Sequence, residues 1–124
     1  MRAVLGGAVA FIEEALRGSS ESKVLIHCAA GISRSSTVTL AYLIKGQKMT
    51  LRRAFETLYA SRRVCWPNDG FMRLLISLER ENALHDGKAS RRAFRPTIDL
   101  AEYVAWGEYD PGSYAAAKTV DRQR

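Results

Sequence analysis

The run from Val24 to Ser36 constrains the fold of this chain more than any other stretch of its sequence. It opens with three aliphatic residues, Val24-Leu25-Ile26, and this unbroken apolar run is typical of a short strand buried on both faces of a parallel sheet. His27-Cys28 and small residues around Gly31 follow, and Arg34 then opens a long apolar segment. This order predicts a strand, a tight loop and the N-terminus of a helix in direct succession.

Such a loop has the chemistry of an anion site. A helix N-terminus has unpaired N–H groups and the positive end of the helix dipole, so it favours negative charge. Short residues around Gly31 let the loop curl with its amides inward, and Arg34 adds a planar fork of donors suited to two phosphate oxygens. Cys28 lies at the mouth of the loop, where helix ends and cations lower a thiol pKa from about 8.5 to roughly 3.5–7.5. The loop therefore offers a nucleophile, backbone donors and a cationic clamp, the groups needed for displacement at phosphorus.

A known signature matches this loop. The H-C-x-x-G-x-x-R-[S/T] pattern of the cysteine-dependent protein tyrosine phosphatases resembles His27-Cys28-Ala29-Ala30-Gly31-Ile32-Ser33-Arg34-Ser35. The Gly31–Ser35 part is most similar to the dual specificity, MAP-kinase-phosphatase-like branch of that superfamily. The resemblance covers about residues 4–80 and continues at 41–45, 49–51, 54–55 and 67–72.

The resemblance implies a role for each residue of the loop. Cys28 attacks the phosphoryl group to form a cysteinyl-phosphate that water then hydrolyses, and Arg34 binds the phosphate through the transition state. Ser35 corresponds to the hydroxyl that hydrogen-bonds the thiolate and eases its departure, although capping of the following helix would explain it too. The residues implied to surround the bound phosphate are Ala29, Ala30, Gly31, Ile32, Ser33 and Arg34.

Further residues have both a functional and a structural interpretation. His27 matches the family histidine that orients the loop by hydrogen bonding, but it could equally be a satisfied histidine at a strand end. Asn68 lies in a Pro-Asn pair that braces the phosphate loop in the family, and helix capping explains it equally well, as it does Asp69. Cys65 is interpreted as a core residue, with a resolving thiol for redox regulation as the alternative.

The implied fold class is α/β, and this chain would hold the C-terminal part of a phosphotyrosine-phosphatase-like fold: a central strand, the phosphate-binding loop and a helix bundle. We expect residues 1–82 to form a partial catalytic domain that is mostly helical, because the earlier strands of the sheet are missing. The strand over residues 23–27 would then have no neighbours. Residues 83–124 form a C-terminal extension that is either loosely ordered or docked by its aromatic side chains.

The resemblance fails at the general acid. The family supplies an aspartate from a loop well before the nucleophile, but the residues preceding Cys28 include no aspartate. Glu13, Glu14 and Glu21 fall on or just after a predicted helix, which is the wrong context. A general acid is commonly worth about 10²–10⁴ in rate, so we expect impaired protonation of the leaving group.

Helical periodicity places the other elements. Val4, Ala8, Ile12 and Leu16, with Phe11 and Ala15, predict a helix over about residues 7–17. A central helix is predicted over 34–45, and Thr50 is a suitable N-cap for the next helix. A further helix, capped by Asn68 or Asp69, should bury Phe71, Leu74, Leu75 and Leu78, and a short one is marked by Ile98, Leu100, Tyr103 and Val104. Turns are predicted at 86–88 and 110–112.

The charge and composition of the chain indicate which classes of molecule it is expected to bind. The net charge of +6 and pI near 9.7 suit the steering of acidic, phosphorylated substrates. No aromatic-interleaved basic motif and no apolar run of membrane-spanning length occurs, so neither nucleic acid nor membrane is an expected partner. The loop has no lysine, which favours phosphoproteins, including MAP kinases as one candidate, over phosphoinositides. A catalytic thiol requires a reducing compartment, hence cytoplasm or nucleus, and no metal or other cofactor is expected.

Two functions follow from this reasoning. The first is a protein phosphatase that hydrolyses phosphotyrosine and phosphoserine or phosphothreonine, with impaired leaving-group protonation. The alternative is a phosphoprotein-binding or regulatory module that keeps the phosphate cradle without effective catalysis. The sequence leaves the oligomeric state open, and also whether the chain folds stably by itself.

Overall fold

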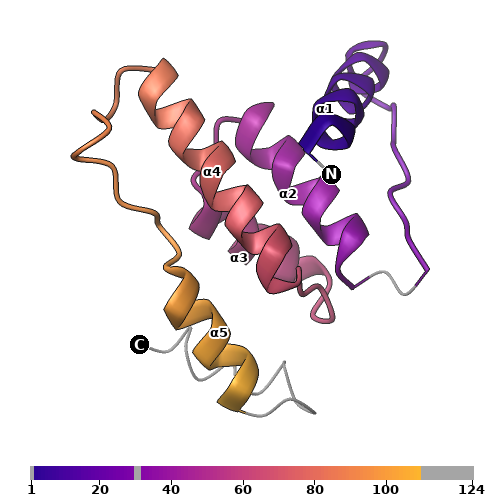
Figure 1. Ribbon diagram of the computed structural model, residues 1–124. Helices are drawn as coiled ribbons and strands as arrows, with labels where there is room; N and C mark the ends of the chain where they lie inside the picture. Colours follow the sequence, from indigo (N-terminus) through magenta and orange to yellow (C-terminus); the bar gives the residue numbers. More distant parts are fainter. Residues whose placement is uncertain (1, 30–31, 110–124) are drawn as a thin grey trace.

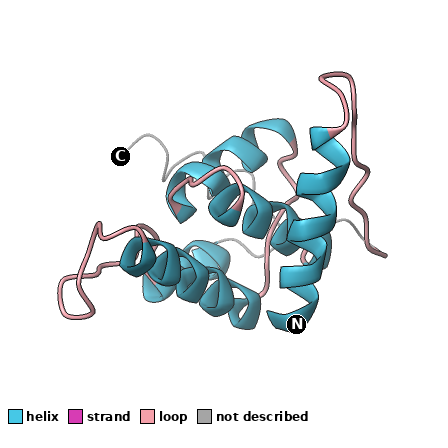
Figure 2. Cartoon of the chain, turned by 90° about the horizontal axis from the view of Figure 1, so that it is seen from above, coloured by secondary structure: helices cyan, strands magenta, loops and turns pink. Residues whose placement is uncertain are grey.

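The computed structural model describes residues 2–29 and 32–109, and within these ranges the chain forms helices joined by loops, with no strand (Figures 1 and 2). Of the helices described, none is long and apolar enough to cross a membrane. The predicted Asp110-Pro111-Gly112 turn lies outside the described residues. The helices are α1 (Arg2–Arg17), α2 (Arg34–Lys45), α3 (Leu51–Ser61), α4 (Asp69–His85) and α5 (Leu100–Tyr109).

Helix α2 is the centre of the molecule, as its apolar circumference predicted. It packs against α1, α3 and α4, and its Leu40, Ala41 and Ile44 side chains are fully buried. Its observed bounds, Arg34–Lys45, are those predicted. Because α2 packs against helices on several sides, its N-terminus holds the end of the preceding loop in a fixed position.

Helix α1 differs from the prediction in its start and in its buried face. It begins at Arg2 rather than near residue 7, and its buried side chains are Leu5, Val9 and Ile12. Val4 and Phe11, two residues of the apolar pattern that predicted this helix, are 62% and 68% exposed. Helix α1 includes the glycine pair at residues 6–7 despite the low helix propensity of glycine, and its packing against α2 stabilises it there.

The predicted strand over residues 23–27 is not formed, and this corrects the sequence-based expectation. Residues 22–28 are irregular, and the Leu25 side chain is 85% exposed rather than buried. A strand needs a neighbour for its backbone N–H and C=O groups, and the described residues supply none. The segment runs past the rest of the chain toward the first turn of α2 without pairing (Figure 1).

Helix α4 begins at the predicted cap but buries a different set of side chains. The Asn68 carboxamide accepts a hydrogen bond from the N–H of Phe71 at 2.8 Å, so Asn68 is the N-cap and Asp69 is the first helical residue. Met72 and Leu75 are fully buried, whereas Phe71 is only half-buried. The helix is therefore rotated slightly from the predicted orientation, and Leu78, but not Leu74, belongs to its buried face.

Side chains from distant parts of the chain satisfy the N-terminus of α3. The predicted Thr50 cap accepts from the N–H of Arg53 at 3.2 Å. The N–H of Leu51 donates to the buried carboxylate of Glu79 at 2.6 Å, and that of Arg52 donates to the Thr97 hydroxyl at 2.9 Å. The first N–H groups of a helix have no partner within the helix, so these side chains replace water at a buried helix end.

The part of the C-terminal extension that the structure describes, residues 83–109, packs against the helices before it. Ile98 and Tyr103 are fully buried. The backbone N–H of Thr97 donates to Glu79 at 2.9 Å, and the Arg52 guanidinium lies 3.3 Å from the Glu102 carboxylate. The predicted helix of this segment is α5, and aromatic packing holds it against α3 and the loop after it.

Candidate active site

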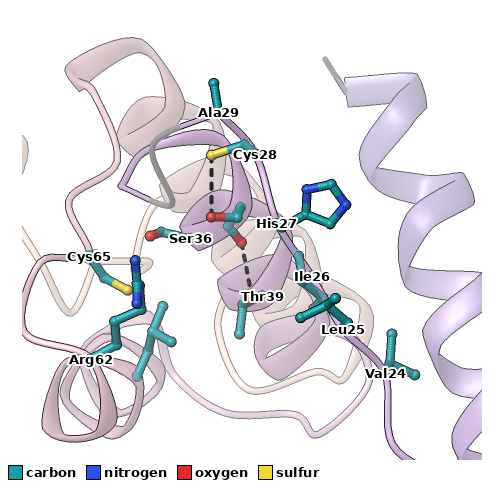
Figure 3. Close-up of a pocket in the computed structure, with 12 residues that line it drawn as sticks. Val24, Leu25, Ile26, His27, Cys28, Ala29, Ser36, Thr39, Arg62 and Cys65 are labelled. Atoms are coloured by element: carbon teal, nitrogen blue, oxygen red, sulfur yellow. Dashed lines mark hydrogen bonds between the residues drawn. The ribbon is translucent and has the colours of Figure 1, made fainter.

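Cys28 lines an open cavity of about 660 Å³ between residues 24–29 and the first turns of α2 (Figure 3). Its Sγ atom donates a hydrogen bond to the Ser35 hydroxyl oxygen at 3.4 Å. Ser35 is 9% exposed and lies in the first turn of α2. The structure thus brings together the predicted nucleophile and the hydroxyl predicted to stabilise it as a leaving group.

Hydroxyl groups of α2 hold the carbonyls of the loop toward the helix. Ser36 donates to the carbonyl of Ile32, and Thr37 donates to the carbonyl of Ser33 at 2.7 Å. The Ser33 side chain makes no capping hydrogen bond to its own helix. In an anion site the backbone N–H groups face the ligand and the carbonyl groups face away from it. The two hydrogen bonds direct the carbonyls of Ile32 and Ser33 toward α2.

The segment before α4 supports the loop from behind. The N–H of Trp66 donates to the carbonyl of Ile32 at 2.8 Å, and the N–H of Asn68 donates to the Ser33 hydroxyl at 2.9 Å. The Asn68 side chain therefore caps α4 and its backbone N–H contacts the loop, while its role as a brace for a phosphate site stays a prediction. Sequence reasoning missed Trp66, because a backbone N–H has no residue-type signal.

Arg34 and His27, two of the predicted site residues, are both exposed, and of these two only His27 lines the cavity. The Arg34 side chain is exposed and is not among the residues that line the cavity, so the predicted clamp on phosphate remains a prediction. His27 is also exposed, and its ring lies on the other side of the extended segment from the Cys28 sulfur (Figure 3). Ala30 and Gly31, predicted to surround the phosphate, lie outside the described residues, whereas Ala29 lines the cavity.

The far wall of the cavity holds residues that the sequence analysis did not assign to the site. Arg62 and Cys65 lie together across the cavity from residues 24–28 (Figure 3). Cys65 is 3% exposed, as expected of a core residue. Arg62 belongs to an arginine pair that was visible in the sequence, but its charge alone did not place it near Cys28.

No described residue that lines the cavity carries a carboxyl group. Glu14 and Glu21 are exposed. The Glu13 carboxylate lies beside Gly46, where an added Cβ atom would be 2.9 Å from the Glu13 oxygen. Within the described ranges, no three His, Cys, Asp or Glu side chains are grouped to hold a metal ion. The polar and reactive groups among the described lining residues are therefore two thiols, an imidazole, hydroxyls and one guanidinium.

Comparison with known proteins identifies the class of protein that this loop and its helices define. The family model of the dual specificity phosphatase catalytic domain matches residues 1–81, and the chain belongs to that family. It is 49% identical over 80 residues to the dual specificity protein phosphatase PHS1 of Arabidopsis thaliana, an alignment that covers 63% of this chain and 8% of the relative. It is 42% identical over 78 residues to dual specificity protein phosphatase 2 of the mouse, which covers 63% of this chain and 24% of the relative.

The fold of the family is shown by solved structures as well. The crystal structure of human DUSP28 superposes with a TM-score of 0.60 and 32% sequence identity, over 64% of this chain and 53% of the human chain. The chain thus spans about half of that structure and a smaller share of the two curated relatives. The recognition of a phosphatase fold from the loop signature is confirmed, and the helical character of the part present agrees with it.

Proposed function

We propose that this chain is the catalytic segment of a protein phosphatase that hydrolyses phosphotyrosine and phosphoserine or phosphothreonine through a cysteinyl-phosphate. One observation carries the proposal: the Cys28 sulfur lies 3.4 Å from the Ser35 hydroxyl at the N-terminus of α2, inside an open cavity. The family membership supports it, because the residues of the signature occupy consecutive positions around this contact.

The reaction has two displacements at phosphorus. In the first, the Cys28 thiolate attacks, an S–P bond forms, and the P–O bond to the substrate side chain breaks with its electron pair on oxygen. In the second, a water molecule attacks phosphorus and releases a proton to the solvent. The S–P bond breaks with its electron pair on sulfur, so inorganic phosphate leaves and the thiolate is restored. Ser35 donates to the departing sulfur in this second step, and Arg34 is assigned to the phosphoryl oxygens.

The oxygen that leaves in the first step must gain a proton. Since none of the described lining residues carries a carboxyl group, we assign the supply of that proton to solvent water. Catalysis without a general acid is slowest for poor leaving groups such as the tyrosine phenolate, whose conjugate acid has a pKa of about 10. We therefore expect turnover of activated aryl phosphates to exceed that of phosphopeptides by about 10²-fold or more.

The substrate class follows from charge. A loop without lysine and a basic chain favour phosphorylated, acidic protein segments, with a MAP kinase as one candidate. The thiol must remain reduced for the first displacement, so the proposal includes action in a reducing compartment, the cytoplasm or nucleus.

The test is turnover of p-nitrophenyl phosphate by the purified chain, with phenyl phosphate as the poor-leaving-group comparison. We expect vanadate-sensitive turnover that Cys28→Ser abolishes and that Ser35→Ala slows in the second step, giving a burst of nitrophenolate. Cys65→Ala is the matched control, since it removes the other thiol and should retain turnover. Turnover that survives Cys28→Ser would refute the proposal.

The absence of a carboxyl group among the described lining residues also favours the second candidate, a phosphoprotein-binding module. Phosphopeptide affinity measured beside turnover separates the two functions. Tight binding to the wild type without hydrolysis would support the module, whereas hydrolysis of the same peptide would exclude it.

A further inference from the structure

The phosphate loop depends on a short segment that lies far from it in the sequence. Trp66 and Asn68 donate backbone hydrogen bonds to Ile32 and Ser33, at 2.8 and 2.9 Å. Ser33 is the N-cap residue of α2, so a displacement of residues 66–68 would be transmitted directly to the loop and to the start of the helix.

Helix α5 holds this segment from the opposite side. The Tyr103 hydroxyl donates to the carbonyl of Pro67 at 2.6 Å, and Tyr103 is fully buried. Its ring stacks on Trp66 with centroids 4.4 Å apart and planes 15° from parallel. The Phe55 ring is nearly perpendicular to the Tyr103 ring, with the two centroids 6.0 Å apart.

One peptide group, that between Pro67 and Asn68, takes part in both the hydrogen bond from Tyr103 and the hydrogen bond to Ser33. The Pro67 carbonyl, which accepts from Tyr103, and the Asn68 N–H, which donates to Ser33, belong to the same planar peptide group. A peptide group that accepts at its oxygen donates more strongly from its nitrogen, because hydrogen bonds in a chain polarise one another. The planarity of the group also means that fixing its oxygen fixes the direction of its N–H.

We propose that Tyr103 is a positioning residue for the phosphate loop, acting through the Pro67–Asn68 peptide group on Ser33; this rests on the proposed phosphatase function. Tyr103 lies beyond residues 1–81, the range that matches the family model, so the support comes from the appended segment. That segment is anchored independently, because Arg52 binds the Thr97 carbonyl at 2.8 Å and lies over the Trp106 ring. Under this proposal the C-terminal extension helps to position the phosphate loop.

The test compares Tyr103→Phe, which keeps the stacked ring and removes only the donor, with Ile98→Val. Ile98 is equally buried on the same appended segment, and the change removes a methyl group without touching a hydrogen bond. Circular dichroism melts establish that both variants fold. The kinetic constants for p-nitrophenyl phosphate are then measured, together with the rate of Cys28 alkylation by iodoacetate across pH, mapped by peptide mass.

We expect Tyr103→Phe to lower kcat about tenfold with a smaller change in KM, because small displacements in a catalytic loop have large effects on rate. At about two pH units below the usual thiol pKa of about 8.5, Cys28 alkylation should slow at least about threefold in this variant, since a displaced loop stabilises the thiolate less. Ile98→Val should stay within about twofold of wild type in both measurements.

An alkylation profile of Tyr103→Phe that matches those of Ile98→Val and wild type would overturn the positioning role. The two proposals can fail separately. If the wild type does not turn over substrate, the proposed function fails, while the alkylation comparison still decides whether Tyr103 acts on the loop.

Discussion

Replacement of Glu79 by alanine would test how the C-terminal extension is attached. The Glu79 carboxylate is 5% exposed and accepts from the N–H of Leu51 at 2.6 Å, from the N–H of Thr97 at 2.9 Å and from the Thr97 hydroxyl. A buried donor left without a partner costs about 1–3 kcal/mol, so these donors together would cost about 3–9 kcal/mol if all stayed buried. Water that enters the space of the lost side chain recovers part of this cost, and a loss of about 3–5 kcal/mol is expected.

That loss is comparable with the whole stability of a small domain, which is about 5–15 kcal/mol. The assay is urea unfolding followed by circular dichroism at 222 nm, a standard helix wavelength. Glu81→Ala is the matched control on the same helix: its side chain is 45% exposed and pairs with Arg2 and Lys45, so solvent screening limits the expected loss to about 0–1 kcal/mol. Equal losses for the two variants would refute the assignment of Glu79 as the buried link between α3, α4 and the extension.

The remaining predictions concern local structure, and each is read from the unfolding free energy. Gly46→Ala should destabilise the chain by about 1–3 kcal/mol, because the added Cβ would lie 2.9 Å from the Tyr42 carbonyl oxygen and ring. Gly6→Ala should instead stabilise α1 by roughly 0.5–1 kcal/mol, because the added Cβ would have no atom within 4 Å. A gain at Gly46 would contradict the close approach. Thr50→Ala should cost about 1 kcal/mol through loss of the α3 cap, and no change would show that the cap is frayed. Leu25→Lys should change stability by less than about 0.5 kcal/mol because Leu25 is 85% exposed, and a larger loss would mean that residues 22–28 are packed.

The sequence was sufficient for features that depend on neighbouring residues. The bounds of α2, the caps at Thr50 and Asn68 and the break after His85 follow from local propensity and turn chemistry, which operate over a few residues. The loop signature was sufficient to recognise the phosphatase family. The family resemblance also implied a contact between Cys28 and Ser35, and the structure has a hydrogen bond between these two side chains.

Tertiary structure decided what depends on residues far apart in the chain. Residues 22–28 have the composition of a buried strand, yet they stay unpaired because a strand exists only beside another strand. Glu79 accepts from Leu51, which is 28 residues earlier, and Tyr103 donates to Pro67, which is 36 residues earlier. No local sequence pattern predicts either contact. The sequence by itself determined the signature of the loop and the central helix after it. Only the packed structure decided which residues far along the chain contact the loop and the helix ends, because those contacts arise from burial rather than from sequence order.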